Sequence, residues 1–169
     1  MITATDLAFA EVQVAPALAV QRNGHSAMDP ASIKAAITEA FEAAMKFVKD
    51  NHLIMNGQPR VVYTAYDAGG MSFTAAIPVS GQAAVTVDEP PVFVATLPGG
   101  KAYRFIHHGP YEELGKTYNE ITAFLKEKGW IETEADWAKY MPMWEEYMND
   151  PETTPPADLM THIYLPAVQ

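Results

Sequence analysis

The sequence predicts an α+β protein in which two β-α-β-β repeats with pseudo-two-fold symmetry form one antiparallel sheet. Three observations support this fold class. Two amphipathic helical segments are separated by short β-rich runs, similar patterns recur in the two halves of the chain, and the 169 residues are 49% hydrophobic, enough for a substantial core. We expect the helices on one face of the sheet and a cleft on the other.

Both helices have start signals and a helical period of apolar residues. The first begins at Asp29-Pro30, a dipeptide suited to the N-cap and the first helical position, and its apolar period continues to Val48. The second begins at Gly109-Pro110, has two glutamates in its first turn, where the helix dipole favours negative charge, and ends near Gly129. Each helix is expected to bury one stripe against the sheet.

Short runs rich in β-forming residues surround these helices and are bounded by turn residues. Each half of the chain therefore follows the order strand, helix, strand, strand. The predicted strands are residues 11–22, 60–65, 73–79, 92–97, 102–107, 142–148 and 160–165.

An internal repeat relates the two halves. Phe47-Val-Lys-Asp-Asn-His-Leu53 ends the first helix, and Phe124-Leu-Lys-Glu-Lys-Gly-Trp130 ends the second with nearly the same order of residue types. Downstream, Tyr63-Thr-Ala-Tyr66 parallels Trp144-Glu-Glu-Tyr147. We therefore expect one domain covering all 169 residues, with pseudo-repeats at about 8–82 and 88–169. Ligand sites occur preferentially at the concavity where two such structural units meet.

The composition excludes several classes of protein. Eleven Lys and Arg against 21 Asp and Glu give a net charge of −10, which argues against direct binding of nucleic acid. The absence of cysteine excludes disulfides, thiolate nucleophiles and cysteine-ligated metals. The N-terminus lacks the basic segment of a signal peptide and no apolar run is long enough to span a membrane, so we expect a cytoplasmic protein that does not contact membranes.

Sequence motifs for catalysis and metal binding are also missing. The chain has no Gly-rich phosphate loop and no G-x-S-x-G elbow. His107 and His108 are adjacent, so in a strand they would point to opposite faces. We therefore predict no catalytic residue, no metal and no cofactor.

The segment Pro142-Met-Trp-Glu-Glu-Tyr-Met148 is the most informative one. In a strand, Glu145 and Tyr147 share one face, and Trp144 and Glu146 share the other. A carboxylate among apolar and aromatic residues is costly to bury unless a positive or hydrogen-bonding group meets it. Two interpretations stay open. In the first, Glu145 or Glu146 lies on a solvated edge. In the second, Glu145 lies at the floor of an aromatic groove and binds a cation.

Aromatic residues are plentiful on the predicted strands near the junction of the repeats. The chain has eight Tyr, three Trp and seven Phe. Any one ring is more often part of a core than of a binding site, but tyrosines together suit the recognition of amphipathic rings and of cations. The candidate ligand-binding residues are Glu145, Tyr147, Tyr164, Tyr63, Trp144 and Phe105.

Several motifs, in their order along the chain, resemble those of a known family. They are Asn56-Gly57-x-Pro59, His108-Gly109-Pro110-Tyr111-Glu112 ahead of a helix, Glu145-x-Tyr147, Asn149-Asp150-Pro151 and the closing Ile163-Tyr-Leu-Pro166. Together they resemble the gyrase-inhibitor-like (GyrI-like) small-molecule-binding domain, which is similar to the effector-binding domain of bacterial multidrug-responsive transcription activators.

The resemblance implies a cleft between two β-α-β-β repeats that takes amphipathic, often cationic, organic molecules. It places the acidic residue of the family's pocket at Glu145, with Tyr147 and Tyr164 on the same strands. His162 stands where members frequently carry an acidic residue. Because the resemblance covers nearly the whole chain, we expect no helix-turn-helix domain, and the acidic balance argues against DNA contact.

Three functions are compatible with these observations. We favour a stand-alone effector-binding protein, a monomer or weak dimer, that takes hydrophobic or cationic small molecules, and we favour this function over that of an enzyme. The resemblance also permits a hydrolase of cyclopropane-bearing alkylating compounds, with Glu145 as a general base. The third function is an interaction module whose acidic surface meets a basic protein partner, as gyrase-inhibiting members imply.

Overall fold

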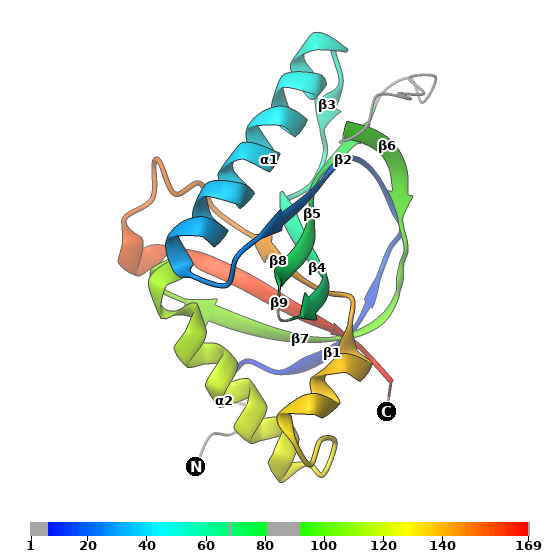
Figure 1. Cartoon of the computed structure of the whole chain (residues 1–169). Helices are drawn as coiled ribbons and strands as arrows, with labels where there is room; N and C mark the ends of the chain where they lie inside the picture. Colours follow the sequence, from blue (N-terminus) through cyan, green and yellow to red (C-terminus); the bar gives the residue numbers. More distant parts are fainter. Residues whose placement is uncertain (1–6, 68, 81–91, 169) are drawn as a thin grey trace. The chain divides into compact units, whose positions relative to one another are not determined.

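A computed structural model describes residues 7–67, 69–80 and 92–168 (Figure 1). In this part of the chain there are nine strands, two α-helices and three short 3₁₀ helices. The chain divides into two compact units. The central unit comprises Ala15–Gly100, and the terminal unit comprises Met1–Val14 and Lys101–Gln169.

The central unit has one helix on one face of an antiparallel sheet. The strand order is β6-β2-β5-β4, and the short β3 pairs with β5. The elements are β2 (Ala17–Ser26), α1 (Pro30–Asp50), β3 (Ile54–Met55), β4 (Arg60–Asp67), β5 (Gly70–Ser80) and β6 (Val92–Leu97).

Helix α1 begins where the sequence predicts. The Asp29 carboxylate accepts a hydrogen bond from the backbone N–H of Ser32 at 2.9 Å, and Pro30 occupies the first turn. The apolar stripe of the helix packs on β2 and β5. The buried cluster at this contact consists of Val20, Ala44, Val48, Ile77 and Val79.

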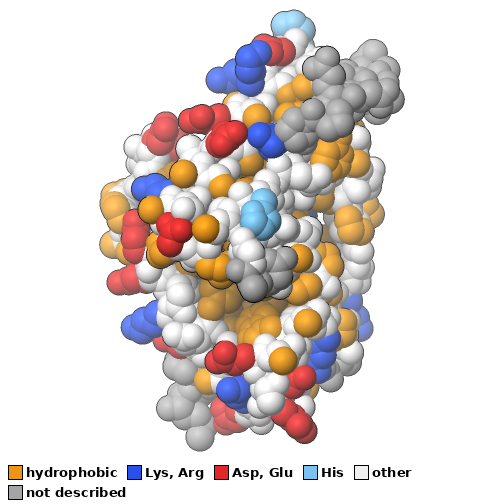
Figure 2. All heavy atoms as spheres, in the orientation of Figure 1, with side chains coloured by type: hydrophobic (Ala, Val, Ile, Leu, Met, Phe, Trp, Pro, Cys, Tyr) orange, Lys and Arg blue, Asp and Glu red, His pale blue; other side chains and the backbone are white. Residues whose placement is uncertain are grey.

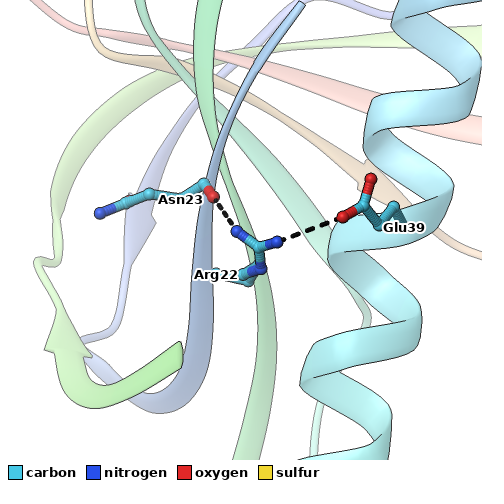
Figure 3. A network of polar contacts seen from close by, with 3 residues as sticks. All are labelled: Arg22, Asn23 and Glu39. Carbon is cyan, nitrogen blue, oxygen red and sulfur yellow. Dashed lines mark hydrogen bonds and ion pairs between the residues drawn. The ribbon is translucent and has the colours of Figure 1, made fainter. Parts of the chain in front are cut away.

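A polar contact also joins β2 to α1 (Figure 3). The Arg22 guanidinium lies 3.4 Å from the Glu39 carboxylate and donates a hydrogen bond to the backbone carbonyl of Asn23 at 2.9 Å. Exposed ion pairs of this kind contribute only about 0–1 kcal/mol. Apolar packing, rather than this ion pair, therefore holds α1 on the sheet.

The terminal unit has the same arrangement. Its strand order is β1-β7-β9-β8, in which β7, β9 and β8 pair in an antiparallel manner. The elements are β1 (Ala10–Val14), β7 (Gly100–His108), η1 (Tyr111–Glu113), α2 (Leu114–Glu127), η2 (Glu134–Tyr140), β8 (Met143–Tyr147), η3 (Pro156–Asp158) and β9 (Met160–Pro166).

The two units thus repeat one topology. In each unit, the last strand of the repeat lies in the middle of the three. It pairs on one side with the strand that precedes the helix and on the other side with the strand that follows the helix, which gives the orders β2-β5-β4 and β7-β9-β8. Each unit also has an edge strand that precedes the other repeat in the sequence. This strand is β6 in the central unit and β1 in the terminal unit. The predicted α+β class, with its β-α-β-β pattern and antiparallel strands, is confirmed. The single domain covering the whole chain stays a prediction.

Some element boundaries differ from the prediction. The segment predicted as one strand at 11–22 forms β1 and β2, because Pro16 between them has no N–H to donate to a sheet. The second helix begins with the 3₁₀ turn η1, and the α-helix starts only at Leu114. The two-residue β3 and the 3₁₀ helix η2 are too short for a periodic apolar pattern and were not predicted.

Acidic side chains are spread over the visible face of the molecule, with fewer basic ones between them (Figure 2). This distribution agrees with the net charge of −10. Among the described residues, no helix combines the length and the apolar character needed to cross a membrane. The same residues contain no group of three or more His, Asp or Glu side chains that could hold a metal ion.

Candidate functional site

Glu145 lies in the middle of β8 and is buried, with 3% of its surface exposed. It is opposite Ile163 of β9, which in turn is opposite Phe105 of β7, so the three side chains share one face of the sheet. Both Ile163 and Phe105 are fully buried. The interpretation of Glu145 as a residue on a solvated edge is therefore wrong.

Two tyrosine hydroxyls donate hydrogen bonds to the Glu145 carboxylate. Tyr118 of α2 donates to Oε2, and Tyr147 of β8 donates to Oε1 at 2.9 Å. Each carboxylate oxygen thus accepts from an O–H group, which offsets part of the cost of removing the charge from water. Because Tyr118 belongs to α2, Glu145 lies on the face that the helix covers and not on the opposite face, where the sequence placed the cleft.

A third tyrosine, Tyr111 of η1, completes the group. Its ring contacts the Tyr147 ring at 5.5 Å between centroids and an interplanar angle of 64°. Burial raises the pKa of the Tyr111 phenol, and the negative charges of Asp150 and Glu145 raise it further. The surroundings of this phenol are therefore electrostatically negative. We call Glu145, Tyr147, Tyr118 and Tyr111 the Glu145 site.

A buried histidine positions the chain segment that carries two of these tyrosines. His107 Nδ1 lies 2.6 Å from the Thr117 hydroxyl, and His107 Nε2 lies 3.0 Å from the Pro110 carbonyl oxygen. Since the carbonyl oxygen can only accept, Nε2 donates to it, and Nδ1 makes the second contact with the Thr117 hydroxyl. Pro110 precedes Tyr111 and Thr117 precedes Tyr118, so His107 holds the backbone beside both rings.

Phe105 shares the face of Glu145 but belongs to an aromatic core. Its ring lies 5.4 Å from that of Phe9 and 5.6 Å from that of Phe124. It is 0% exposed. The contacts of Phe105 are thus those of a packing residue beneath the Glu145 site.

The sheet separates two other predicted residues from Glu145. Trp144 of β8 is opposite Tyr164 of β9, on the other face, and their rings stack at 5.1 Å and 12°. Tyr63 lies in the central unit, on β4, where it is buried and stacks on Tyr66 at 6.2 Å and 22°. Of the predicted aromatic residues, Tyr147 donates a hydrogen bond to Glu145.

The sequence analysis did not identify Tyr118 and Tyr111 as site residues. A signal was present for Tyr118, because it lies in the apolar stripe of α2 between Leu114 and Ile121. A tyrosine in a buried stripe brings a hydroxyl that needs a partner, and a carboxylate on the covered strand supplies it. Tyr111 stands inside the motif that precedes the helix but offers no comparable periodic signal.

Several solved structures share this fold. The C-terminal domain of EcmrR has a TM-score of 0.72 at 17% identity, with 94% of this chain and 95% of that chain covered. In the EcmrR–DNA complex the TM-score is 0.72 at 16% identity, with 94% of this chain covered, which spans only 56% of the EcmrR chain. SAV2435 bound to tetraphenylphosphonium has a TM-score of 0.60 at 16% identity, with coverage of 94% and 92%. A hydrolase from Listeria innocua has a TM-score of 0.58 at 14% identity, with coverage of 94% and 90%.

At these identities, the structural likeness shows the fold alone. The chain has no match among curated protein sequences. The family model of the GyrI-like small molecule binding domain, in contrast, matches residues 26–168, which include both helices and all of the Glu145 site. The resemblance inferred from the motifs is confirmed: this chain belongs to the GyrI-like family of small-molecule-binding domains.

Proposed function

We propose that this chain binds amphipathic organic cations at the Glu145 site. The observation that carries the proposal is a carboxylate that is 3% exposed and accepts hydrogen bonds from two tyrosine hydroxyls. A charge that is partly removed from water attracts a cation more strongly than an exposed one, because solvent screening is weaker. The tyrosine rings add faces over which a cation is stabilised.

The accessibility of the residues supports this assignment. Tyr111, Tyr118 and Tyr147 are only half-buried, while Glu145 is buried beside them. A lipophilic cation can therefore contact the rings first and approach the carboxylate through them. Its apolar groups gain from leaving water, and its charge gains from the carboxylate.

Electrostatics support a cation over an anion. The whole chain carries a net charge of −10, and the pKa of Tyr111 is raised by burial and by the charges of Asp150 and Glu145. SAV2435, which shares the fold, has been solved with tetraphenylphosphonium bound, and this molecule is a lipophilic cation. We use the same cation as the probe for this chain.

Calorimetric titration with tetraphenylphosphonium tests the proposal. We expect saturable binding to the native chain and a loss of about tenfold or more in Glu145→Gln, since two charges 4 Å apart near a protein surface attract by about 4 kcal/mol before desolvation costs. Glu146→Gln is the matched control, because it removes the same charge from the neighbouring residue on the opposite face. Equal affinities of the native chain and Glu145→Gln would contradict the proposal.

We further propose that the protein acts alone in the cytoplasm as a monomer or weak dimer. Sedimentation velocity, with and without tetraphenylphosphonium, tests the oligomeric state.

Hydrolysis is a second candidate function, and one feature of the site favours it. Glu145 is a buried carboxylate beside hydroxyl groups, which is the arrangement of a general base with nearby proton donors. The structurally similar Listeria innocua protein is described as a hydrolase. Incubation with a cyclopropane-bearing alkylating compound, followed by mass spectrometry, separates the two functions. Repeated turnover that Glu145→Gln abolishes supports a hydrolase, whereas stoichiometric binding without product supports a binding protein.

A further inference from the structure

The connection between β8 and β9 lies beside the segment that carries Tyr111 (Figure 1). The N–H of Gly109, directly after β7, donates a hydrogen bond to the carbonyl oxygen of Leu159, directly before β9, at 2.8 Å. Within the β8–β9 connection, the Asn149 side chain donates to the Asp158 carbonyl oxygen at 2.9 Å and so joins the two ends of the loop. This loop is therefore anchored next to the segment that precedes α2.

Asp150 has a fixed backbone and an exposed side chain in this loop. Its Oδ1 accepts a hydrogen bond from the Glu152 N–H at 2.8 Å, and its carbonyl oxygen accepts from the Thr154 N–H at 2.9 Å. Aspartate favours turns of this kind, because its side chain bonds the backbone two residues on. The ion pairs of the described residues involve other carboxylates, so Asp150 has no Lys or Arg partner there.

The Tyr111 phenol lies in the field of two carboxylates that differ in exposure. Burial raises the pKa of this phenol, the negative charge of Asp150 raises it further, and that of Glu145 follows. Asp150 is exposed, Tyr111 is half-buried and Glu145 is buried. The Tyr111 ring contacts that of Tyr147, whose hydroxyl donates to Glu145. Two tyrosine rings thus connect an acid at the surface with an acid in the interior.

We propose that Asp150 is a second cation subsite beside the Glu145 site, so that the chain takes aromatic dications in preference to monocations with the same rings. This inference rests on the proposed function, because it needs a first cationic group at Glu145. The second cationic group lies at Asp150, and the aromatic part of the ligand lies against Tyr111 and Tyr147. A dication gains over a monocation because each of its charges then has a counter-charge.

The two subsites differ in how strongly salt weakens them. Asp150 is exposed, so water and salt screen its charge, and a pair of exposed charges changes an affinity by up to about fivefold. Glu145 is 3% exposed, so added salt weakens its attraction less. The preference for a dication should therefore decrease as salt is added, while the binding of a monocation persists.

Fluorescence titration with ethidium and propidium tests the subsite. The two dyes share one cationic ring system, and propidium carries a second, quaternary ammonium group on a side chain. At low salt we expect the native chain to bind propidium about three- to fivefold more tightly than ethidium. Asp150→Asn should remove this preference, and Asn keeps an oxygen for the Glu152 N–H. Glu152→Gln, which neutralises another exposed carboxylate of the same loop, is the matched control and should retain it.

Nuclear magnetic resonance of tyrosine rings labelled at Cζ tests the placement of Asp150 without a ligand. Tyr111→Phe assigns the resonance of Tyr111, whose shift is followed as the pH is raised. Asp150→Asn should lower the pKa of Tyr111, because it removes a negative charge that disfavours the phenolate. Glu152→Gln should leave this pKa closer to its native value.

Three results would overturn the proposal. These are equal affinities of the native chain for ethidium and propidium, an unchanged preference for propidium in a folded Asp150→Asn variant, or an unchanged pKa of Tyr111 in that variant. Circular dichroism confirms that each variant is folded. Failure of the proposed function gives a different result, in which Glu145→Gln does not weaken tetraphenylphosphonium binding or this cation does not bind. A chain that binds tetraphenylphosphonium through Glu145 and does not prefer propidium keeps the proposed function and loses the second subsite.

Discussion

The two faces of the β7-β9-β8 sheet carry opposite chemistry on adjacent residues. Glu145 faces α2, and both of its oxygens accept hydrogen bonds from tyrosine hydroxyls. Trp144, its neighbour in the chain, faces the other way and has an indole N–H without an acceptor among the described residues. A shift of one residue along the strand thus separates a carboxylate that accepts two hydroxyl donors from an indole N–H that has no acceptor among the described residues.

This comparison changes how the predicted ligand-binding residues are grouped. The sequence placed them around one cleft, but the sheet puts Glu145 and Tyr147 on one face and Trp144 and Tyr164 on the other. The aromatic residues therefore do not form one uniform wall, and each face can be perturbed by itself.

The largest expected effect is on the Glu145 face. Tyr118→Phe removes a donor to a buried carboxylate, so we expect the free energy of unfolding to fall by about 1.5–3 kcal/mol. Trp144→Phe on the opposite face removes an N–H that has no described partner, so it should cost less than Tyr118→Phe. Urea denaturation measures both variants. A larger loss for Trp144→Phe would show that its N–H is satisfied in solution.

A smaller effect concerns the pH dependence of the Trp144 face. Burial, Arg104 and His108 lower the pKa of His162 below its ordinary value of 6.5, so near and below pH 6.5 the unfolded chain binds more protons at this residue. The contribution of neutral His162 to the free energy of unfolding is complete above pH 6.5. It is lost as the pH falls through the lowered pKa of the folded state. His162→Gln should therefore flatten the decrease in the free energy of unfolding between about pH 7.5 and pH 5.

The control for this measurement is His25→Gln, which makes the same substitution at an exposed strand position. Urea denaturation at several pH values gives the slope for each variant. If His162→Gln and the native chain had the same slope, burial and the positive neighbours Arg104 and His108 would not lower the pKa of His162 as inferred.

The smallest expected effect separates the two glutamates. Glu146→Gln removes a negative charge from the face opposite Glu145, so we expect the affinity for tetraphenylphosphonium to change by no more than about twofold, as is usual for partly exposed charges. A Glu146→Gln variant that lost tetraphenylphosphonium binding would mean that the cation uses the opposite face.

Part of this site was predictable from local pattern. The two-residue period of a strand puts Glu145 and Tyr147 on one face, and the structure has them hydrogen-bonded there. Asp29-Pro30 likewise marked the start of α1, because capping depends on neighbouring residues alone. The order of short motifs indicated the family, which the family model confirms over residues 26–168.

The apparent repeat of Tyr63-Thr-Ala-Tyr66 and Trp144-Glu-Glu-Tyr147 was misleading in one respect. In β4 the register shifts between Tyr63 and Ala65, so Tyr63 and Tyr66 share a face and stack. In β8 the register is continuous from Trp144 to Tyr147, so these two residues lie on opposite faces. Residue types alone do not reveal a bulge, because the partner strand decides where the ladder shifts.

The amino-acid sequence by itself determined the two helices, the α+β class, the family and the shared face of Glu145 and Tyr147, because capping, periodicity and alternation act between near neighbours. Only the tertiary structure decided which face of the sheet α2 covers. That choice brings the Tyr118 hydroxyl to a carboxylate 27 residues away and leaves the Trp144 indole on the other side. It depends on how a helix and a strand pack across the fold, and no local pattern contains that information.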